Sequence, residues 1–164
     1  MDALTLLRDQ AANANRILQQ VFEPVTPEQA SWRAPGSLAN TIGATFTHVY
    51  FGEDQMVHSA TGSPTVFESG GWRERLGFDG DSMWTYSGAF DPKKQLEYAN
   101  AVTAATSDYL ASLSPDALEE LIETPRGPQP RVGRLSVYLV VHKFQHQGEI
   151  AALLGCQGQK GLPF

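Results

Sequence analysis

The segment 135–156, LSVYLVVHKFQHQGEIAALLGC, places the strongest constraint on how this chain can fold. Its apolar and histidine side chains recur every three or four residues, which is the period of one face of an α-helix. The residues on this face are Leu135, Leu139, His142, His146, Ile150 and Leu153. The pattern predicts a long helix with one face turned toward the protein interior.

His142 and His146 are four residues apart on that face, so their imidazole rings leave adjacent turns on the same side of the helix. Zinc, nickel and similar divalent ions favour imidazole nitrogen, and a catalytic site typically has three protein ligands and one open position. A third ligand must then come from another element, and the only other histidines are His48 and His58. The alternative is that both histidines of the pair are polar residues of a partly hydrated core.

Composition narrows the class of protein. The chain has 164 residues, 41% of them hydrophobic, which is enough for a single domain over residues 1–164 with a proper core. Its formal net charge of −6 leaves no basic surplus to neutralise phosphate, so nucleic acid is not an expected partner. One cysteine, Cys156, cannot form an internal disulfide. With no secretion signal and no apolar run near the ~20 residues of a membrane span, we expect a cytoplasmic protein without a membrane partner.

Three further helices are expected from the same periodicity. Residues 2–22 and 92–113 both carry apolar side chains at three-to-four spacing, and Asp91 before a proline is a favourable start for the second of them. Another helix is expected from about residue 38 to 60, with Ser37 as its N-terminal cap. The inward positions expected on that helix are Leu38, Thr41, Thr45, His48, Gly52 and Gln55.

Helical phase separates the two remaining histidines. At 100° per residue, His58 lies roughly 80° around the helix from His48, so both cannot face one interior site. His48 is therefore the expected third ligand, and His58 is expected at the surface near the end of the helix. Glu53 and Asp54, about a turn beyond His48, are interpreted as part of a solvated face.

Residues 61–91 lack sustained periodicity but contain several aromatic residues, Trp72 and Trp84 among them. A connection of this length is unnecessary in an up-and-down bundle, so we expect it to cross the length of the bundle and to let the second and third helices run parallel. The predicted fold is all-α, a four-helix bundle with a long crossover between helices 2 and 3. The proline- and glycine-rich segment 124–135 is expected to be a loop or short hairpin.

The order and spacing of these motifs resemble the DinB/YfiT-like superfamily of proposed metalloenzymes over nearly the whole chain. The resemblance is carried by THVYFGED around His48, by HKFQHQGEIAALLG at residues 142–155, and by the tail GLPF at residues 161–164. It implies a divalent metal, zinc or nickel above all, held by His48, His142 and His146. It also implies a homodimer.

The same resemblance implies a low-molecular-weight thiol as cosubstrate, because relatives include thiol-dependent S-transferases and a mycothiol-dependent maleylpyruvate isomerase. This chain has Gln147 and Glu149 where many relatives carry Arg and Gln. The departure leaves the three ligand positions unchanged, but the relatives' substrates cannot be transferred to this chain.

Glu149, three residues after His146, has two interpretations. It could orient a ligand histidine or act as a general base toward metal-bound water, or it could be a surface carboxylate that pairs with a dimer partner. Two functions follow. One is a metal-dependent enzyme, a thiol-dependent S-transferase or isomerase, or a hydrolase. The alternative is a non-catalytic metal-binding or protein-interaction bundle, for example in stress response.

Overall fold

The computed structural model describes residues 2–124 and 127–162, and nearly all of its regular structure is helical. The long helices are α1 (Ala3–Phe22), α3 (Ile42–Thr61), α6 (Pro92–Ser112) and α8 (His142–Cys156). The shorter elements are α2 (Pro27–Ser31), α4 (Val66–Ser69), α5 (Trp72–Leu76), η1 (Gly80–Ser82), η2 (Asp116–Glu119), β1 (Leu121–Ile122), β2 (Gln129–Pro130), α7 (Arg131–Ser136) and η3 (Val137–Val141). The predicted all-α class is confirmed.

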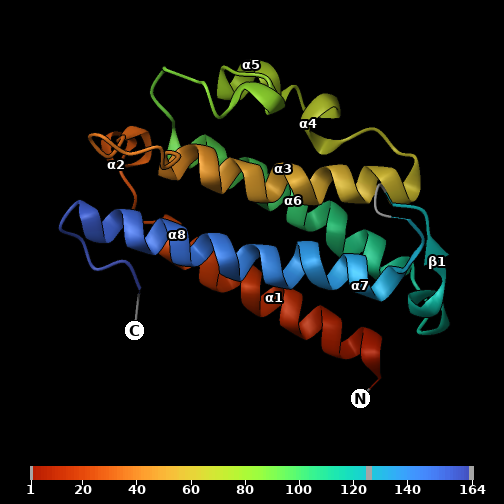
Figure 1. Ribbon diagram of the computed structural model, residues 1–164. Coiled ribbons are helices and arrows are strands. Elements are labelled where there is room, and N and C mark those ends of the chain that lie inside the picture. Colours follow the sequence, from red (N-terminus) through yellow and green to blue (C-terminus); the bar gives the residue numbers. More distant parts are fainter. Residues whose placement is uncertain (1, 125–126, 163–164) are drawn as a thin grey trace.

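The long helices lie side by side, as Figure 1 shows. α3 and α6 run in the same direction, and α1 and α8 run in the opposite one. Between α3 and α6 the chain passes along the outside of the molecule, where it forms α4, α5 and η1, and returns to the end at which α3 began (Figure 1). Two long helices that follow each other in the sequence and run parallel require a connection that returns to the starting end. The segment between α3 and α6 is long enough to provide it.

The crossover is held to the helices by Asp54, which is buried in α3. Its two carboxylate oxygens accept hydrogen bonds from the backbone N–H groups of Val66 and Phe67, each at 2.8 Å, and so cap the first turn of α4. The hydroxyl of Tyr98 in α6 donates to the same carboxylate at 3.0 Å. Glu53 is buried as well. The interpretation of Glu53 and Asp54 as a solvated face is therefore wrong, because each carboxylate has partners on other elements.

The start of α3 also differs from the prediction. Thr41, not Ser37, is the cap, and its hydroxyl accepts the backbone N–H of the third residue beyond it. The hydroxyl of Ser37 accepts the N–H two residues along and so stabilises a turn instead. Leu38 consequently lies outside the helix and is fully exposed, and Gln55 is exposed on the outer side of α3. Both had been expected to point inward.

The last helical segment is longer than predicted and contains a local irregularity. α7 begins at Arg131, four residues before the expected start, and continues through η3 into α8. η3 is π-helical, a rare widening of the helix that often occurs at functional sites, and it ends immediately before His142. β1 and β2 pair antiparallel, so a short hairpin does form, but its first strand lies before the predicted segment 124–135, and residues 131–135 belong to α7. Residues 125–126 of that predicted loop and residues 163–164 of the GLPF tail lie outside the described residues.

The core consists of two apolar clusters with a layer of polar side chains between them. In one cluster the rings of Phe22 and Phe46 stack with centroids 3.6 Å apart, and the other contains Leu7 and Leu139. Every long helix contributes to the layer between them. Its members are Asn15, Tyr50, Glu53, Thr103, Thr106 and Lys143. The Nζ atom of Lys143 lies 2.8 Å from Oε2 of Glu53, and both side chains are almost completely buried.

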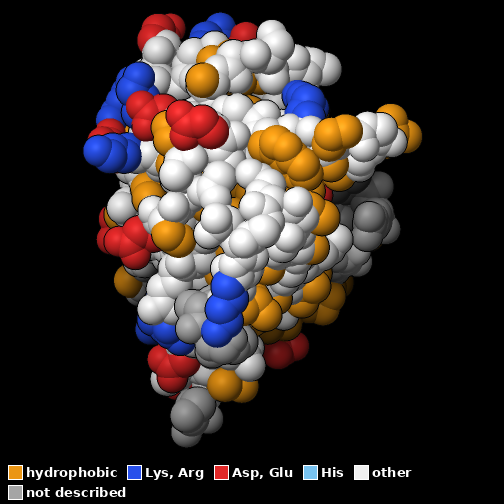
Figure 2. All heavy atoms as spheres, turned by 90° about the vertical axis from the view of Figure 1, so that its left-hand side faces the viewer, with side chains coloured by type: hydrophobic (Ala, Val, Ile, Leu, Met, Phe, Trp, Pro, Cys, Tyr) orange, Lys and Arg blue, Asp and Glu red, His pale blue; other side chains and the backbone are white. Residues whose placement is uncertain are grey.

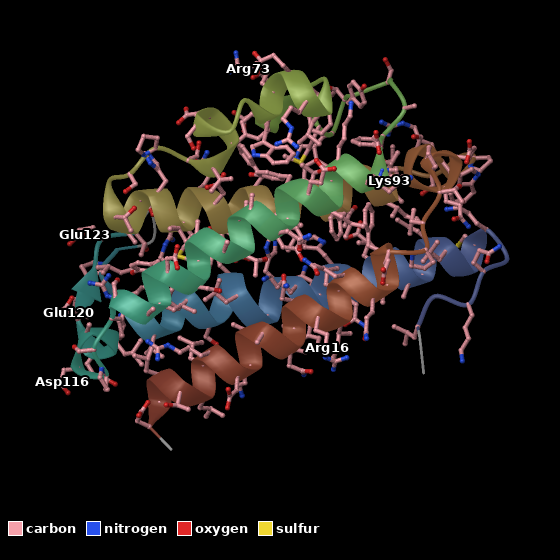
Figure 3. All side chains as sticks on the ribbon, turned by 180° about the vertical axis from the view of Figure 1, so that it is seen from behind. Arg16, Arg73, Lys93, Asp116, Glu120 and Glu123 are labelled. Carbon is pink, nitrogen blue, oxygen red and sulfur yellow. The ribbon has the colours of Figure 1, made fainter. Side chains whose placement is uncertain are left out.

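Charged side chains elsewhere lie on the surface of the molecule, and the six residues labelled in Figure 3 are among them. At the end of the molecule that contains α2, acidic and basic side chains are interspersed, and hydrophobic side chains gather beside them (Figure 2). Within the part of the chain that the structure describes, no helix is both long and apolar enough to cross a membrane.

Candidate metal centre

The helices α3 and α8 bring three histidines together. His48 lies near the middle of α3, and His142 and His146 occupy the first two turns of α8, which packs against α3. The ring centroid of His48 is 4.9 Å from that of His142 and 5.2 Å from that of His146. His58 is elsewhere, near the C-terminal end of α3, where its Nδ1 contacts the carbonyl oxygen of Ser63. The histidine chosen from helical phase is thus the one that joins the pair.

The distances suit a single ion. One nitrogen from each of the three rings can be chosen so that all lie within 4.8 Å of one another. Nε2 of His142 is 3.1 Å from Nε2 of His48. Two imidazole nitrogens that bind one zinc ion at about 2.1 Å and a near-tetrahedral angle are roughly 3.4 Å apart. These residues therefore fit a divalent ion without a large movement of either helix.

Burial keeps two of the rings in the form that binds metal. Removal from water, together with the neighbouring His146, His48 and Lys143, lowers the pKa of His142 to about 4. Burial also lowers the pKa of His48, as does His146, while Glu149 opposes the shift. Both rings are consequently neutral at pH 7, with a nitrogen lone pair available for coordination.

Glu149 holds the third ring. Its Oε2 lies 2.8 Å from Nδ1 of His146, one turn earlier on α8. A carboxylate at Nδ1 fixes the proton on that nitrogen and leaves Nε2 of His146 directed at the other rings. His142 has no such partner: its Nδ1 is buried and unbonded among the described residues. Its ring is positioned by packing near Gly52 and Tyr138 instead.

Replacing Glu149 by glutamine is expected to lower the affinity for zinc about tenfold to a hundredfold, because the amide no longer fixes the His146 ring through a charged hydrogen bond. Competition with a chromophoric chelator measures this. Glu119→Gln, at an exposed position of η2, is the matched control and should leave the affinity unchanged. Equal zinc affinity in both variants would show that Glu149 has no part in orienting the ligand.

The crossover reaches the site as well. The half-buried ring of Trp84 lies 4.7 Å from that of His48 and covers one side of it. Trp72, in contrast, is buried in the core against Tyr98, with ring centroids 5.3 Å apart. From the sequence, core packing is the favoured role for both tryptophans. It holds for Trp72, whereas Trp84 lies against His48. Residues 61–91 have no periodicity from which the direction of a side chain follows.

The comparisons with known proteins agree with this architecture. The sequence profile of the DinB superfamily matches residues 10–150. A solved structure described as a conserved protein of a locus from Enterococcus faecalis superposes with a TM-score of 0.78 at 16% sequence identity, covering 93% of this chain and 95% of the other. At that identity the likeness shows a shared fold alone. No curated protein matches the sequence at a significant level. Because the family match spans most of the chain, including all three histidines, this protein belongs to the DinB superfamily.

Proposed function

We propose that this protein binds a divalent metal ion, zinc or nickel, through His48, His142 and His146, and acts as a metal-dependent enzyme with a thiol cosubstrate. The observation that carries the proposal is the convergence of three imidazoles to within 4.8 Å, with no fourth His, Cys, Asp or Glu in that group among the described residues. Three neutral ligands leave the charge of the ion uncompensated and one coordination position for a substrate, which is the arrangement typical of catalytic sites.

An ion in this site supplies Lewis acidity, which favours the thiolate form of a thiol and the hydroxide form of water. The chain's own residues have separate tasks. Glu149 keeps the proton on Nδ1 of His146, and this contact supports the orienting role over that of a general base. Trp84 shields one side of His48 from solvent. A thiol-dependent S-transferase or isomerase needs only these functions, whereas a hydrolase would need Glu149 to leave His146 and accept a proton from water.

The alternative is a non-catalytic bundle that binds metal or another protein. Three apolar side chains of the last helical segment are exposed at helical spacing: Val137 (51%), Val141 (53%) and Phe144 (40%). Such a stripe supports association with a partner, and a second copy in a homodimer is the partner that we propose. We also propose that the long helices form a four-helix bundle and that the protein works in a reducing cytoplasm. The single cysteine, a free thiol, supports the second of these.

The test has two stages. Elemental analysis of protein purified without an affinity tag is expected to give about one zinc or nickel ion per chain, and His48→Ala should reduce this several-fold. The protein with its metal is then assayed for conjugation of 1-chloro-2,4-dinitrobenzene with cysteine, glutathione and coenzyme A. We expect turnover with at least one thiol, lost on chelation and restored by the metal.

Two outcomes would contradict the proposal in different ways. Less than half an ion per chain, or a content unaffected by His48→Ala, would remove the metal site itself. A full complement of metal without turnover of any thiol would favour the non-catalytic alternative, and light scattering would then show whether the protein is a dimer.

A further inference from the structure

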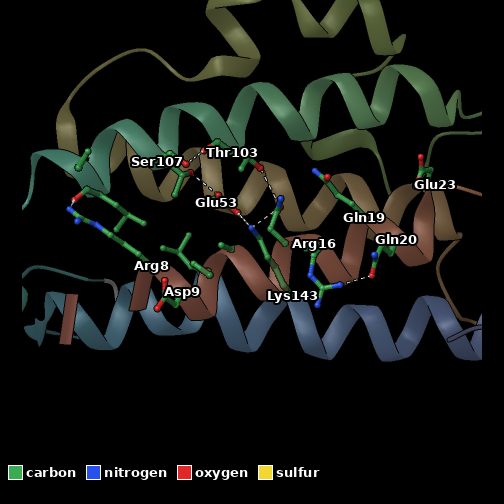
Figure 4. A pocket seen from close by; sticks show the side chains of 17 residues that line it. Arg8, Asp9, Arg16, Gln19, Gln20, Glu23, Glu53, Thr103, Ser107 and Lys143 are labelled. Atoms are coloured by element: carbon green, nitrogen blue, oxygen red, sulfur yellow. Dashed lines mark hydrogen bonds and ion pairs between the residues drawn. The ribbon is translucent and has the colours of Figure 1, made fainter. Parts of the chain in front are cut away.

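A concave site lies between α1 and α6, apart from the histidines. It is a groove of about 670 Å³, and none of the three histidines lines it. Figure 4 shows its polar side chains, which come from α1, α3, α6 and α8. A volume of this size accommodates a small organic molecule.

The floor of the groove belongs to the polar layer of the core. Lys143 and Glu53 form their ion pair there, and the hydroxyl of Thr106 donates to Oε1 of Glu53 at 2.7 Å. Nζ of Lys143 also donates to Oδ1 of Asn15 at 3.1 Å. Both oxygens of Glu53 are thus engaged, one with the ammonium and one with the hydroxyl. A ligand on this floor would meet no free carboxylate oxygen.

The groups that are still free on the floor are donors. An ammonium can only donate, so its contact with Asn15 fixes the amide with Oδ1 toward Lys143. The hydroxyl of Tyr50 also donates to this Oδ1, at 2.8 Å. Nδ2 of Asn15 therefore points away from the layer and has no partner among the described residues. Lys143 likewise retains donor capacity, because its only hydrogen bond among the described residues goes to Asn15, and its contact with Glu53 is an ion pair.

The ends and walls of the groove limit what can enter. Arg8 donates to the carbonyl oxygen of Leu110 at 2.5 Å, and so joins α1 to α6. Gln19 donates to Asn100 at 3.0 Å and joins the same two helices about three turns further along. Between these bridges Leu139 and the methyl group of Ala11 contribute apolar surface. The groove is thus bridged by side chains at two levels and has apolar surface above a polar floor.

Charge selects the ligand class. The ammonium of Lys143 is already paired with Glu53. The lining as a whole is balanced in charge, with Arg8, Arg16 and Lys143 against Asp9, Glu23 and Glu53, so it offers a carboxylate no net attraction. We propose that the groove binds a small uncharged amphiphile whose carbonyl or amide oxygen accepts hydrogen bonds from Asn15 and Lys143, with its apolar part against Leu139 and Ala11. This site does not depend on the metal centre.

Nile red, an uncharged dye with a carbonyl acceptor, is a suitable probe. Its fluorescence should rise and saturate at one dye per chain, and hexanamide should displace it at least ten times more effectively than hexanoate at pH 7. Ala12→Trp, which places an indole in the groove, should lower the affinity for the dye at least tenfold. The matched control is Ala152→Trp on α8, an exposed alanine that does not line the groove, and it should have no effect.

The side-chain amide of Asn15 gives an independent readout in the unaltered protein, in case Ala12→Trp does not fold. Its ¹⁵N resonance should shift on titration with hexanamide, and equally in metal-free protein. Displacement by hexanoate as effective as by hexanamide would overturn the ligand class. Dye binding that Ala12→Trp leaves unchanged, or an Asn15 resonance that hexanamide does not move, would overturn the site.

Discussion

Replacing Lys143 by methionine is expected to lower the free energy of unfolding by about 3–5 kcal/mol. Methionine retains the apolar stem of the side chain but leaves the carboxylate of Glu53, which is 1% exposed, without its counter-charge. An isolated buried charge is costly because neither water nor another cation replaces the lost partner. Domains are commonly stable by about 5–15 kcal/mol, so this one substitution would remove a large part of the total.

Urea denaturation of metal-free protein measures this loss without a contribution from the histidine site. Lys93→Met, at an exposed lysine near the start of α6, is the matched control and should change the free energy of unfolding by no more than about 0.5 kcal/mol. Adding Glu53→Leu to Lys143→Met should recover most of the loss, since an apolar pair can replace a buried ion pair. A loss below about 1 kcal/mol for Lys143→Met would show that water reaches Glu53.

The second large effect concerns His142→Ala in the presence of zinc. At a free zinc concentration a thousand times its dissociation constant, a site present only in the folded state contributes about 4 kcal/mol of stability. For a chain of this size that corresponds to roughly 10 °C in the melting temperature. We expect the unaltered protein to melt about that much higher in zinc than in chelator, and His142→Ala to lose this difference.

Calorimetry of both proteins in zinc and in EDTA makes the comparison. In EDTA the variant should lose only the smaller packing contribution of a half-buried ring. His58→Ala is the matched control, because its histidine lies outside the cluster, and it should retain the full response to zinc. Equal destabilisation of His142→Ala in zinc and in EDTA would mean that the residue is simply part of the core.

The long helices could be predicted because their information is local. A period of 3.6 residues identifies an inward face, and the cap Asp91 precedes α6 as expected, with its carboxylate accepting from the N–H groups of the first turn. Helical phase likewise distinguished His48, which faces the interior site, from His58. Choosing the cap of α3 was harder, since Ser37 and Thr41 both have hydroxyls and only the path of the chain between them decides which one is used.

The features that sequence reasoning missed depend on partners far away in the chain. Glu53 pairs with Lys143, which is 90 residues later, and Asp54 caps a turn that begins twelve residues beyond it. Neither contact leaves a periodic signal, and a pair of acids on a helix is usually solvated. Trp84 reaches His48 from a segment without regular structure. Such contacts follow from the assembled fold and not from local spacing.

The ion pair in the middle of the core also sets how far α8 can move along α3. A slip of one helical turn, about 5.4 Å, would pull the ammonium of Lys143 away from Glu53 and place two separate charges among leucines. Apolar contacts alone would tolerate such sliding far better, because they are not directional. His142 adjoins Lys143 in sequence, and His48 precedes Glu53 on the same helix. The ion pair of the lysine thus fixes the axial register of α8 against α3, and with it the position at which the imidazoles of the two helices meet.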